Sequence, residues 1–340
     1  MLLKIIRIPI VLLCLLALAV PSPAAADETP PAQAFVSTEV NPLSLHIGET
    51  ASVSVKLNNV PVEGYKSAEF TCTYDAGLIE KGNLAVTDLF GVEPVVAIHE
   101  PQTGSFIVAI AGSNSNRAMT SGPVFTFSAK GLQAGQSVVQ CAARLSAGDN
   151  IPIDVPLTGA SLTIQPVEIL PTPSEAPIST PIEQENPIPT SIPPELPTPV
   201  PSPNGFVSGQ VIASKPVTVR LLDANRAEIT SVVANPDGTF NLTALAGTYT
   251  LLATASGFLS HQGSFAINAG ETTLKSVSHL LAGDVDGNHV IDQFDALTIG
   301  MSYTSSIPEA ANLNNDALID FLDLELLAEN YHQTGPSVWE

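Results

Sequence analysis

The chain has 340 residues, and its 33 acidic and 12 basic side chains give a formal net charge of −21 at pH 7. So acidic a chain excludes nucleic acid as a natural partner, because a polyanion binds basic surfaces. The sequence also lacks the nucleophile-elbow, zinc-protease, phosphate-loop and dinucleotide motifs, so we expect no enzyme. A pair of acids brought together by the fold for glycoside cleavage has no sequence signature and stays open.

Residues 1–26 have the three parts of a secretory signal peptide. Lys4 and Arg7 precede an apolar run over 8–20, and three alanines end the segment at Ala26. The apolar run is too short to span a bilayer, and Leu13 before Cys14 is not the small residue of a lipoprotein cleavage site. We therefore expect a secreted, extracellular protein without membrane insertion, held at a cell surface only through a partner.

Residues 36–165 predict an all-β sandwich. They contain short strand signals separated by turn residues, without helical periodicity. The expected strands cover 51–57, 68–74, 106–111, 124–129, 138–145 and 160–164. Cys72 and Cys141 lie in two alternating strands, and both a disulfide and two buried free thiols fit that pattern.

Several segments of this region occur in an order that resembles the cohesin family. They are Ile47-Gly-Glu-Thr50, Glu63-Gly-Tyr65, Ala68-Glu-Phe70, Tyr74-Asp-Ala-Gly-Leu-Ile-Glu80 and Phe125-Thr-Phe-Ser-Ala-Lys130. The resemblance implies a partner that carries a dockerin. A generic sandwich of immunoglobulin type is the alternative.

Residues 166–204 predict a linker rich in Pro, Thr and Ser. Thirteen of the 29 prolines of the chain lie between Pro166 and Pro203. Proline at this density favours extended polyproline II at about 3.1 Å per residue, so the segment could hold two bodies up to roughly 100 Å apart.

Residues 205–281 predict a second, smaller β-sandwich. The run from Asp237 to Leu251, with Gly257 and Phe258 after it, resembles the carboxypeptidase regulatory-like, transthyretin-like sandwich. That resemblance implies a module without catalysis. We expect it to brace the segment that follows or to extend its contact surface.

Two stretches near the C-terminus, 284–295 and 312–323, repeat one pattern of oxygen-bearing side chains at positions 1, 3, 5, 9 and 12. This spacing wraps a short loop around a calcium ion. A single such loop could be an ordinary turn, but both are in register and both lead into an apolar helical stretch. Neither is a full EF-hand, because position 6 is His289 or Ala317 and position 12 is Asp in both.

The paired loops, with Gly283-Asp284-Val285 at their start, resemble the dockerin family over residues 282–335. The resemblance implies two Ca²⁺ ions and a partner that carries a cohesin. The implied side-chain ligands are Asp284, Asp286, Asn288, Asp292 and Asp295 in the first loop, and Asn312, Asn314, Asp316, Asp320 and Asp323 in the second; the backbone carbonyls of Val290 and Leu318 complete the two sets. The second loop has fewer charges, so we expect weaker binding there.

The same resemblance places partner recognition at loop positions 10 and 11, which are Gln293, Phe294, Phe321 and Leu322. The alternative is that Phe294 and Leu322 pack the small helical core. The combined pattern predicts a secreted, non-catalytic adaptor of the cellulosome type, which assembles polysaccharide-degrading enzymes or surface scaffolds. We expect its two halves not to bind each other, because a matched pair would join the chain to itself or polymerise it.

Two other functions fit the same sequence. One is a calcium-stabilised adhesin or carbohydrate-binding surface protein in which both sandwiches contact polysaccharide. Sugar-binding faces usually stack on exposed Trp or Tyr, and the single Trp of the chain, Trp339, is near the C-terminus, which argues against this function. The other makes the loops purely structural, so that calcium adds stability without creating a binding surface.

Overall fold

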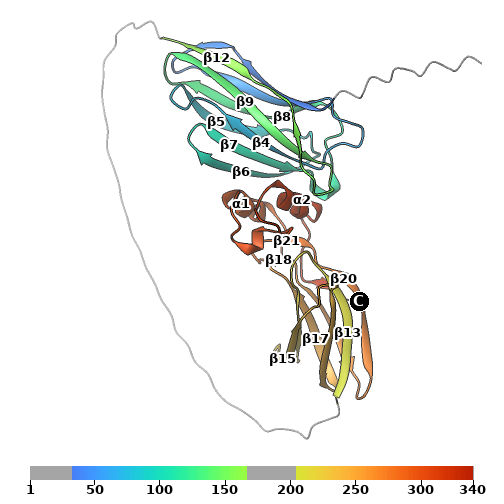
Figure 1. Cartoon of the computed structure of the whole chain (residues 1–340). Coiled ribbons are helices and arrows are strands. Elements are labelled where there is room, and N and C mark those ends of the chain that lie inside the picture. The colour runs from blue at the N-terminus through green and yellow to red at the C-terminus, as the bar shows by residue number, and fades with distance from the viewer. Residues whose placement is uncertain (1–32, 167–203, 340) are drawn as a thin grey trace, which may run out of the picture. The chain divides into compact units, whose positions relative to one another are not determined.

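The computed structural model describes residues 33–166 and 204–339. The expected signal peptide over 1–26, and the linker apart from its first and last residues, lie outside the described residues. The expected mostly β chain is confirmed, because strands form most of the described elements (Figure 1). Among the described helices, none has the length and apolar character needed to cross a bilayer.

Two sheets build the N-terminal sandwich. One has the order β11-β1-β3-β8-β5 and the other β2-β12-β9-β4-β7-β6, with β10 paired to β9. The strands are β1 (Phe35–Asn41), β2 (Ser44–His46), β3 (Thr50–Asn58), β4 (Ser67–Thr73), β5 (Ile79–Val86), β6 (Val95–Gln102), β7 (Ser105–Ala111), β8 (Gly122–Gly131), β9 (Gly135–Ser146), β10 (Ile153–Val155), β11 (Leu157–Thr158) and β12 (Ala160–Gln165). A short 3-10 turn, η1 (Ser113–Ser115), follows β7.

Strand alternation fills the space between these two sheets. In β3, Ala51, Val53, Val55 and Leu57 are all buried, and the residues between them are more exposed. A period of two places such residues on one face of a strand, so one sheet can present a continuous apolar face to the other. The aromatic rings of Phe70 and Phe125 meet edge to face at 5.4 Å in the same core.

Cys72 and Cys141 are opposite each other on β4 and β9 and are joined by a disulfide. The bond spans 69 residues of sequence. A covalent bridge restricts the unfolded chain more strongly when the closed loop is long, which for this separation corresponds to about 4 kcal/mol of stability.

We therefore expect the double change Cys72→Ala, Cys141→Ala to destabilise the N-terminal sandwich by about 2–5 kcal/mol. Urea unfolding followed under oxidising conditions would measure the loss. Adding reductant to the wild-type chain should reproduce most of it, and an unchanged midpoint in both experiments would contradict the prediction.

The second sandwich also consists of two sheets, with the orders β16-β13-β20 and β15-β14-β17-β19-β22. Its strands are β13 (Asn204–Ile212), β14 (Thr218–Leu222), β15 (Glu228–Val233), β16 (Thr239–Leu245), β17 (Gly247–Thr254), β19 (His261–Ile267), β20 (Thr272–His279) and β22 (Ser337–Val338). The last strand brings the C-terminal end of the chain back to β19. Trp339 is buried there, where its ring meets Phe240 and its indole N–H donates to the carbonyl of Ser276 at 3.3 Å.

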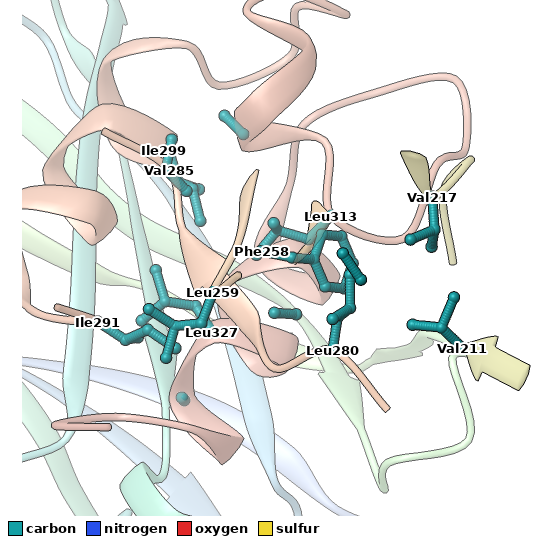
Figure 2. Packing of buried hydrophobic residues seen from close by; sticks show 14 of the residues in the cluster. Val211, Val217, Phe258, Leu259, Leu280, Val285, Ile291, Ile299, Leu313 and Leu327 are labelled. Carbon is teal, nitrogen blue, oxygen red and sulfur yellow. The ribbon is translucent and has the colours of Figure 1, made fainter. Parts of the chain in front are cut away.

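The paired loops and their helices are packed onto the end of this second sandwich. The elements are β18 (Gly257–Phe258), β21 (Ala282–Asp284), α1 (Gln293–Met301), the 3-10 turn η2 (Glu309–Ala311) and α2 (Phe321–Glu329). One apolar cluster continues from Val211 and Val217 of the sandwich through Phe258 to Ile291 and Leu327 of the helical part (Figure 2). The second sandwich therefore shares its core with the loop-and-helix module.

Candidate functional site: two acidic loops and a sheet face

Each acidic loop ends in a helix that begins in the same way. Asp292 caps α1 by accepting from the amide of Phe294 at 2.7 Å, and Asp295 accepts from the amide of Asp292 at 2.9 Å. Asp320 and Asp323 repeat this arrangement at the start of α2, with distances of 2.8 Å for both bonds. A side-chain oxygen at the N-cap and another at the third helical position satisfy amides that no helical carbonyl reaches.

The two loops also share a backbone shape. The residue at position 4 is left-handed in both, with φ of 76° at Gly287 and 59° at Asn315. Glycine and asparagine are the residues that adopt this region at least cost. Val290 and Leu318 each donate their amide to the side chain two residues earlier, at 2.7 and 2.8 Å.

Three carboxylates of the first loop converge. Oxygen atoms of Asp284, Asp286 and Asp295 all lie within 4.8 Å of one another. Burial raises the pKa of Asp295 to about 6, and burial also raises the pKa of Asp284. A set of hard oxygen donors at this density fits a calcium ion, whose charge would offset the mutual repulsion of the carboxylates.

The other two predicted side-chain ligands of the first loop are held nearby by local bonds. The amide nitrogen of Asn288 donates to Asp286 at 3.0 Å, and the carboxylate of Asp292 is engaged in capping α1.

The second loop differs in how it uses its acids. Asn312 and Asn314 accept from the amide of Asp316 at 3.1 and 3.0 Å. Asp323 is fully buried, accepts from the amide of Asn314 at 3.0 Å, and has a pKa raised by burial to about 7. Asp320 turns one oxygen outward to Arg144 of the N-terminal sandwich at 3.2 Å. Asp320, a predicted calcium ligand, therefore also forms an ion pair between the two modules.

The outer face of the sheet that contains β4, β7 and β6 is covered. All seven residues of β7 are buried. Phe106, Val108 and Ile110 belong to the core of the N-terminal sandwich, whereas Ile107 and Ala109 belong to the cluster that contains the helices. A strand of an antiparallel sandwich normally exposes one face to water, so burial of both faces marks a surface against which another module packs.

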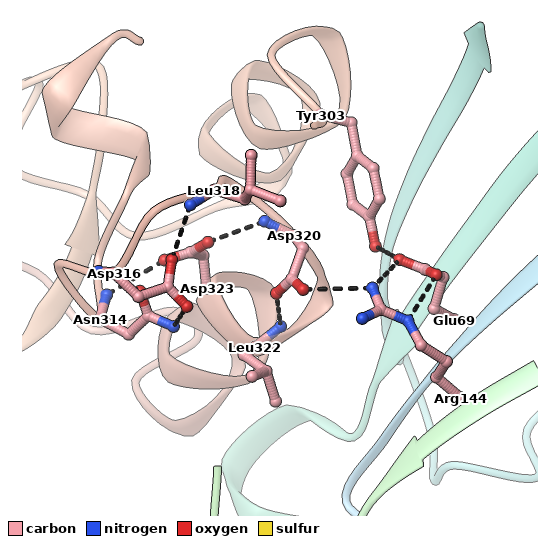
Figure 3. A network of polar contacts seen from close by, with 9 residues as sticks. All are labelled: Glu69, Arg144, Tyr303, Asn314, Asp316, Leu318, Asp320, Leu322 and Asp323. Atoms are coloured by element: carbon pink, nitrogen blue, oxygen red, sulfur yellow. Dashed lines mark hydrogen bonds and ion pairs between the residues drawn. The ribbon is translucent and has the colours of Figure 1, made fainter. Parts of the chain in front are cut away.

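A buried polar network crosses this contact (Figure 3). The guanidinium of Arg144 donates two bonds of 2.9 Å to the carboxylate of Glu69 on the adjacent strand. Tyr303 donates its hydroxyl to the same carboxylate, and Asp320 pairs with Arg144 from the other side. The bonds to Glu69 raise the pKa of Arg144, and burial, followed by the charge of Glu69, raises the pKa of Tyr303 well above its ordinary value.

Further polar contacts surround the network. Ser67 donates to Glu325, and Lys66 pairs with Glu329. His99 of β6 lies 3.1 Å from the carbonyl oxygen of Gly300. Both α1 and α2 therefore contribute to the contact.

The four residues expected at positions 10 and 11 divide as follows. Gln293 donates to the carbonyl of Val96 at 2.8 Å, Phe321 lies 5.1 Å from the guanidinium carbon of Arg144, and Leu322 is buried in the shared cluster. Phe294 is 67% exposed, so the interpretation that it packs the helical core is wrong.

The structure places the two halves in contact, whereas the sequence led us to expect that they would not bind each other. Sequence reasoning missed the residues that form this contact, which are Lys66, Ser67, Glu69, His99, Arg144, Gly300, Tyr303, Glu325 and Glu329. One feature of the sequence does indicate that this sheet face is covered. The expected strand 106–111 is apolar throughout rather than alternating, which is typical of a strand covered on both faces.

Comparison with known proteins gives structural similarity alone. No protein-family model matches the chain, and no curated protein matches it either. A cohesin of scaffoldin B from Acetivibrio cellulolyticus, solved with a Cel5 dockerin, is 16% identical, with 39% of this chain and 100% of that chain covered and a TM-score of 0.35. A cohesin module of a family 33 glycoside hydrolase from Clostridium perfringens is 16% identical, with 40% and 98% covered and a TM-score of 0.35. A non-cellulosomal cohesin from Archaeoglobus fulgidus is 14% identical, with 39% and 92% covered and a TM-score of 0.33.

Proposed function

We propose that this protein is a secreted, non-catalytic adaptor that assembles extracellular complexes through calcium-dependent binding of the cohesin–dockerin type. The observation that carries the proposal is the burial of both faces of β7, the outer one against a helical module that begins at two acidic loops. In this function the N-terminal sandwich offers the sheet face, and residues 282–335 offer the helices. The cargo would be polysaccharide-degrading enzymes or surface scaffolds.

Calcium has a specific task in this proposal. The loops hold their acids close together, and burial raises the pKa of both Asp295 and Asp323, which disfavours the charged carboxylates. Two bound ions would compensate these charges and fix the relative positions of α1 and α2, so that metal binding becomes part of the folding energy of the module. Only an ordered helix pair presents one continuous surface to a sheet.

The carbohydrate-binding alternative has less support from the structure. Sugar-binding faces commonly stack on exposed aromatic rings, and Trp339, the one Trp of the chain, is buried against Phe240.

We expect isothermal titration of the secreted chain with calcium to show two sites, the first loop binding more tightly than the second. The double change Asp284→Ala, Asp286→Ala should remove the tighter site, because it deletes two of the three converging carboxylates. Asp237→Ala is a matched control, since Asp237 is an acid of an ordinary turn that accepts from the amide of Thr239 at 3.0 Å.

Either of two results would count against the proposal. Absence of binding at millimolar calcium would make the loops ordinary turns. Binding that raises the melting temperature without promoting contact of the helices with a sheet face, in this chain or in an added cohesin-bearing protein, would make the loops purely structural.

A further inference from the structure

We propose that the outer face of β4, β7 and β6 has as its partner the helical module of the same chain, so that the protein binds its own C-terminal part when calcium is present. This inference rests on the proposed function and names the partner of its sheet face. It reverses the expectation that a chain with both halves must keep them incompatible.

Charge complementarity is the first argument. The sheet side contributes the cations Lys66 and Arg144, and the helical side contributes the anions Asp320, Glu325 and Glu329. Basic residues are scarce in this chain, with 12 against 33 acidic ones. Two of them on one face, each opposite an acid of the other module, form a selective match for this partner.

Burial of polar groups is the second argument. Glu69, Tyr303, Asp320 and Glu325 are all at least nine-tenths buried. Each has a hydrogen bond across the contact or to a group that has one. Buried polar groups are costly unless they are paired. A surface that touched its neighbour by chance would leave such groups unpaired. In this contact all four groups are paired.

Steric fit is the third argument. A Cβ atom at Gly300 of α1 would lie 3.1 Å from the carbonyl oxygen of Ile98 and 3.3 Å from the Cβ of Ala97. The backbone of α1 can approach β6 because a glycine faces the strand at this point. Ala97 and Ala109 offer small side chains on the sheet side of the same cluster.

The helical module that covers the sheet face belongs to the same molecule. The sequence between the two described parts has 37 residues, from 167 to 203. A tether of this length in polyproline II conformation spans up to roughly 100 Å. It also keeps the two surfaces at a high effective concentration, so that the same chain outcompetes a second copy at low protein concentration. An external partner of either module would then have to displace the internal one.

The test uses the full secreted chain, studied by sedimentation velocity and small-angle scattering at several protein concentrations, with calcium or with a chelator. Gly300→Leu improves helix propensity but places a side chain against β6, and Met301→Leu on the exposed side of α1 is its matched control. We expect the wild type and Met301→Leu to be compact monomers in calcium. Gly300→Leu should lose the compact form and give a larger radius of gyration.

A charge exchange provides the second set of variants. Lys66→Glu and Glu329→Lys should each lose the compact form, and the double variant should regain it because the ion pair is restored in reverse. Lys130→Glu, which alters an exposed pair with Glu80 on the other sheet, should have no effect. Recovery in the double variant could not be obtained from misfolded chains.

Three other outcomes would distinguish failure of the inference from failure of the proposed function. An extended monomer that still binds calcium by calorimetry would overturn the inference and leave the proposed function intact. A mass that doubles with concentration and returns to that of a monomer in Gly300→Leu would assign the face to a second copy instead. Absence of calcium binding would instead contradict the proposed function.

Discussion

Asp295→Ala is expected to unfold the first loop and the start of α1 even in the absence of calcium. One oxygen of Asp295 accepts from the amides of Val285 and Asp286 at 2.8 and 3.0 Å, and the other accepts from Asp292 at 2.9 Å. The side chain is fully buried, so its removal leaves three amides without a partner. The amide of Val285 is buried, whereas those of Asp286 and Asp292 are only partly buried. A buried group without a partner costs about 1–3 kcal/mol, so the predicted loss is about 1–3 kcal/mol.

Calorimetric unfolding of the full chain in chelator would measure this loss. Asp286→Ala is the control, because Asp286 belongs to the same carboxylate cluster but is exposed and bonds within the loop to Asn288. We expect Asp286→Ala to weaken calcium binding with little effect on the metal-free protein. A metal-free protein that is as stable with Asp295→Ala as with Asp286→Ala would show that Asp295 acts only as a metal ligand.

The acidic loops could be predicted from sequence because their determinants are local. Helix caps, left-handed turn positions and carboxylate spacing depend on residues within twelve positions of one another. The mostly β character of the chain was equally accessible through the alternation seen in β3. Repetition of the loop in register made the pattern much stronger than either copy alone.

The contact between the halves could not be predicted in the same way. Glu69 and Tyr303 are separated by 234 residues, and nothing in the local pattern of either residue indicates the other. Glu69 looks like an ordinary outward-facing acid of β4, and it is buried only because the helices cover it. The apolar composition of β7 shows that its outer face is covered but does not identify what covers it.

Arg144→Met is expected to destroy the contact between the sheet face and the helices. Glu69 and Asp320 both depend on this guanidinium for their counter-charge. Removing one member of a buried ion pair costs about 3–5 kcal/mol, because the remaining charge is left uncompensated. The Arg144 side chain is 36% exposed, so we expect the lower end of this range. Arg144→Lys should restore little, since a lysine cannot make the two parallel bonds that Glu69 accepts. Hydrogen exchange of α1, α2 and β7 in calcium should show protection reduced at least about a hundredfold.

Two further variants separate charge imbalance from general damage to the sandwich. The double change Glu69→Gln, Arg144→Met removes the anion together with its cation, so it should be milder than Arg144→Met alone. Arg220→Met breaks an exposed pair with Glu228 at 3.5 Å in the second sandwich, where we expect a loss below about 1 kcal/mol. If the double variant exchanged as fast as Arg144→Met, the network would be incidental to the contact. Apolar packing of Ile107 and Ala109 against the helices would then be its main source of stability.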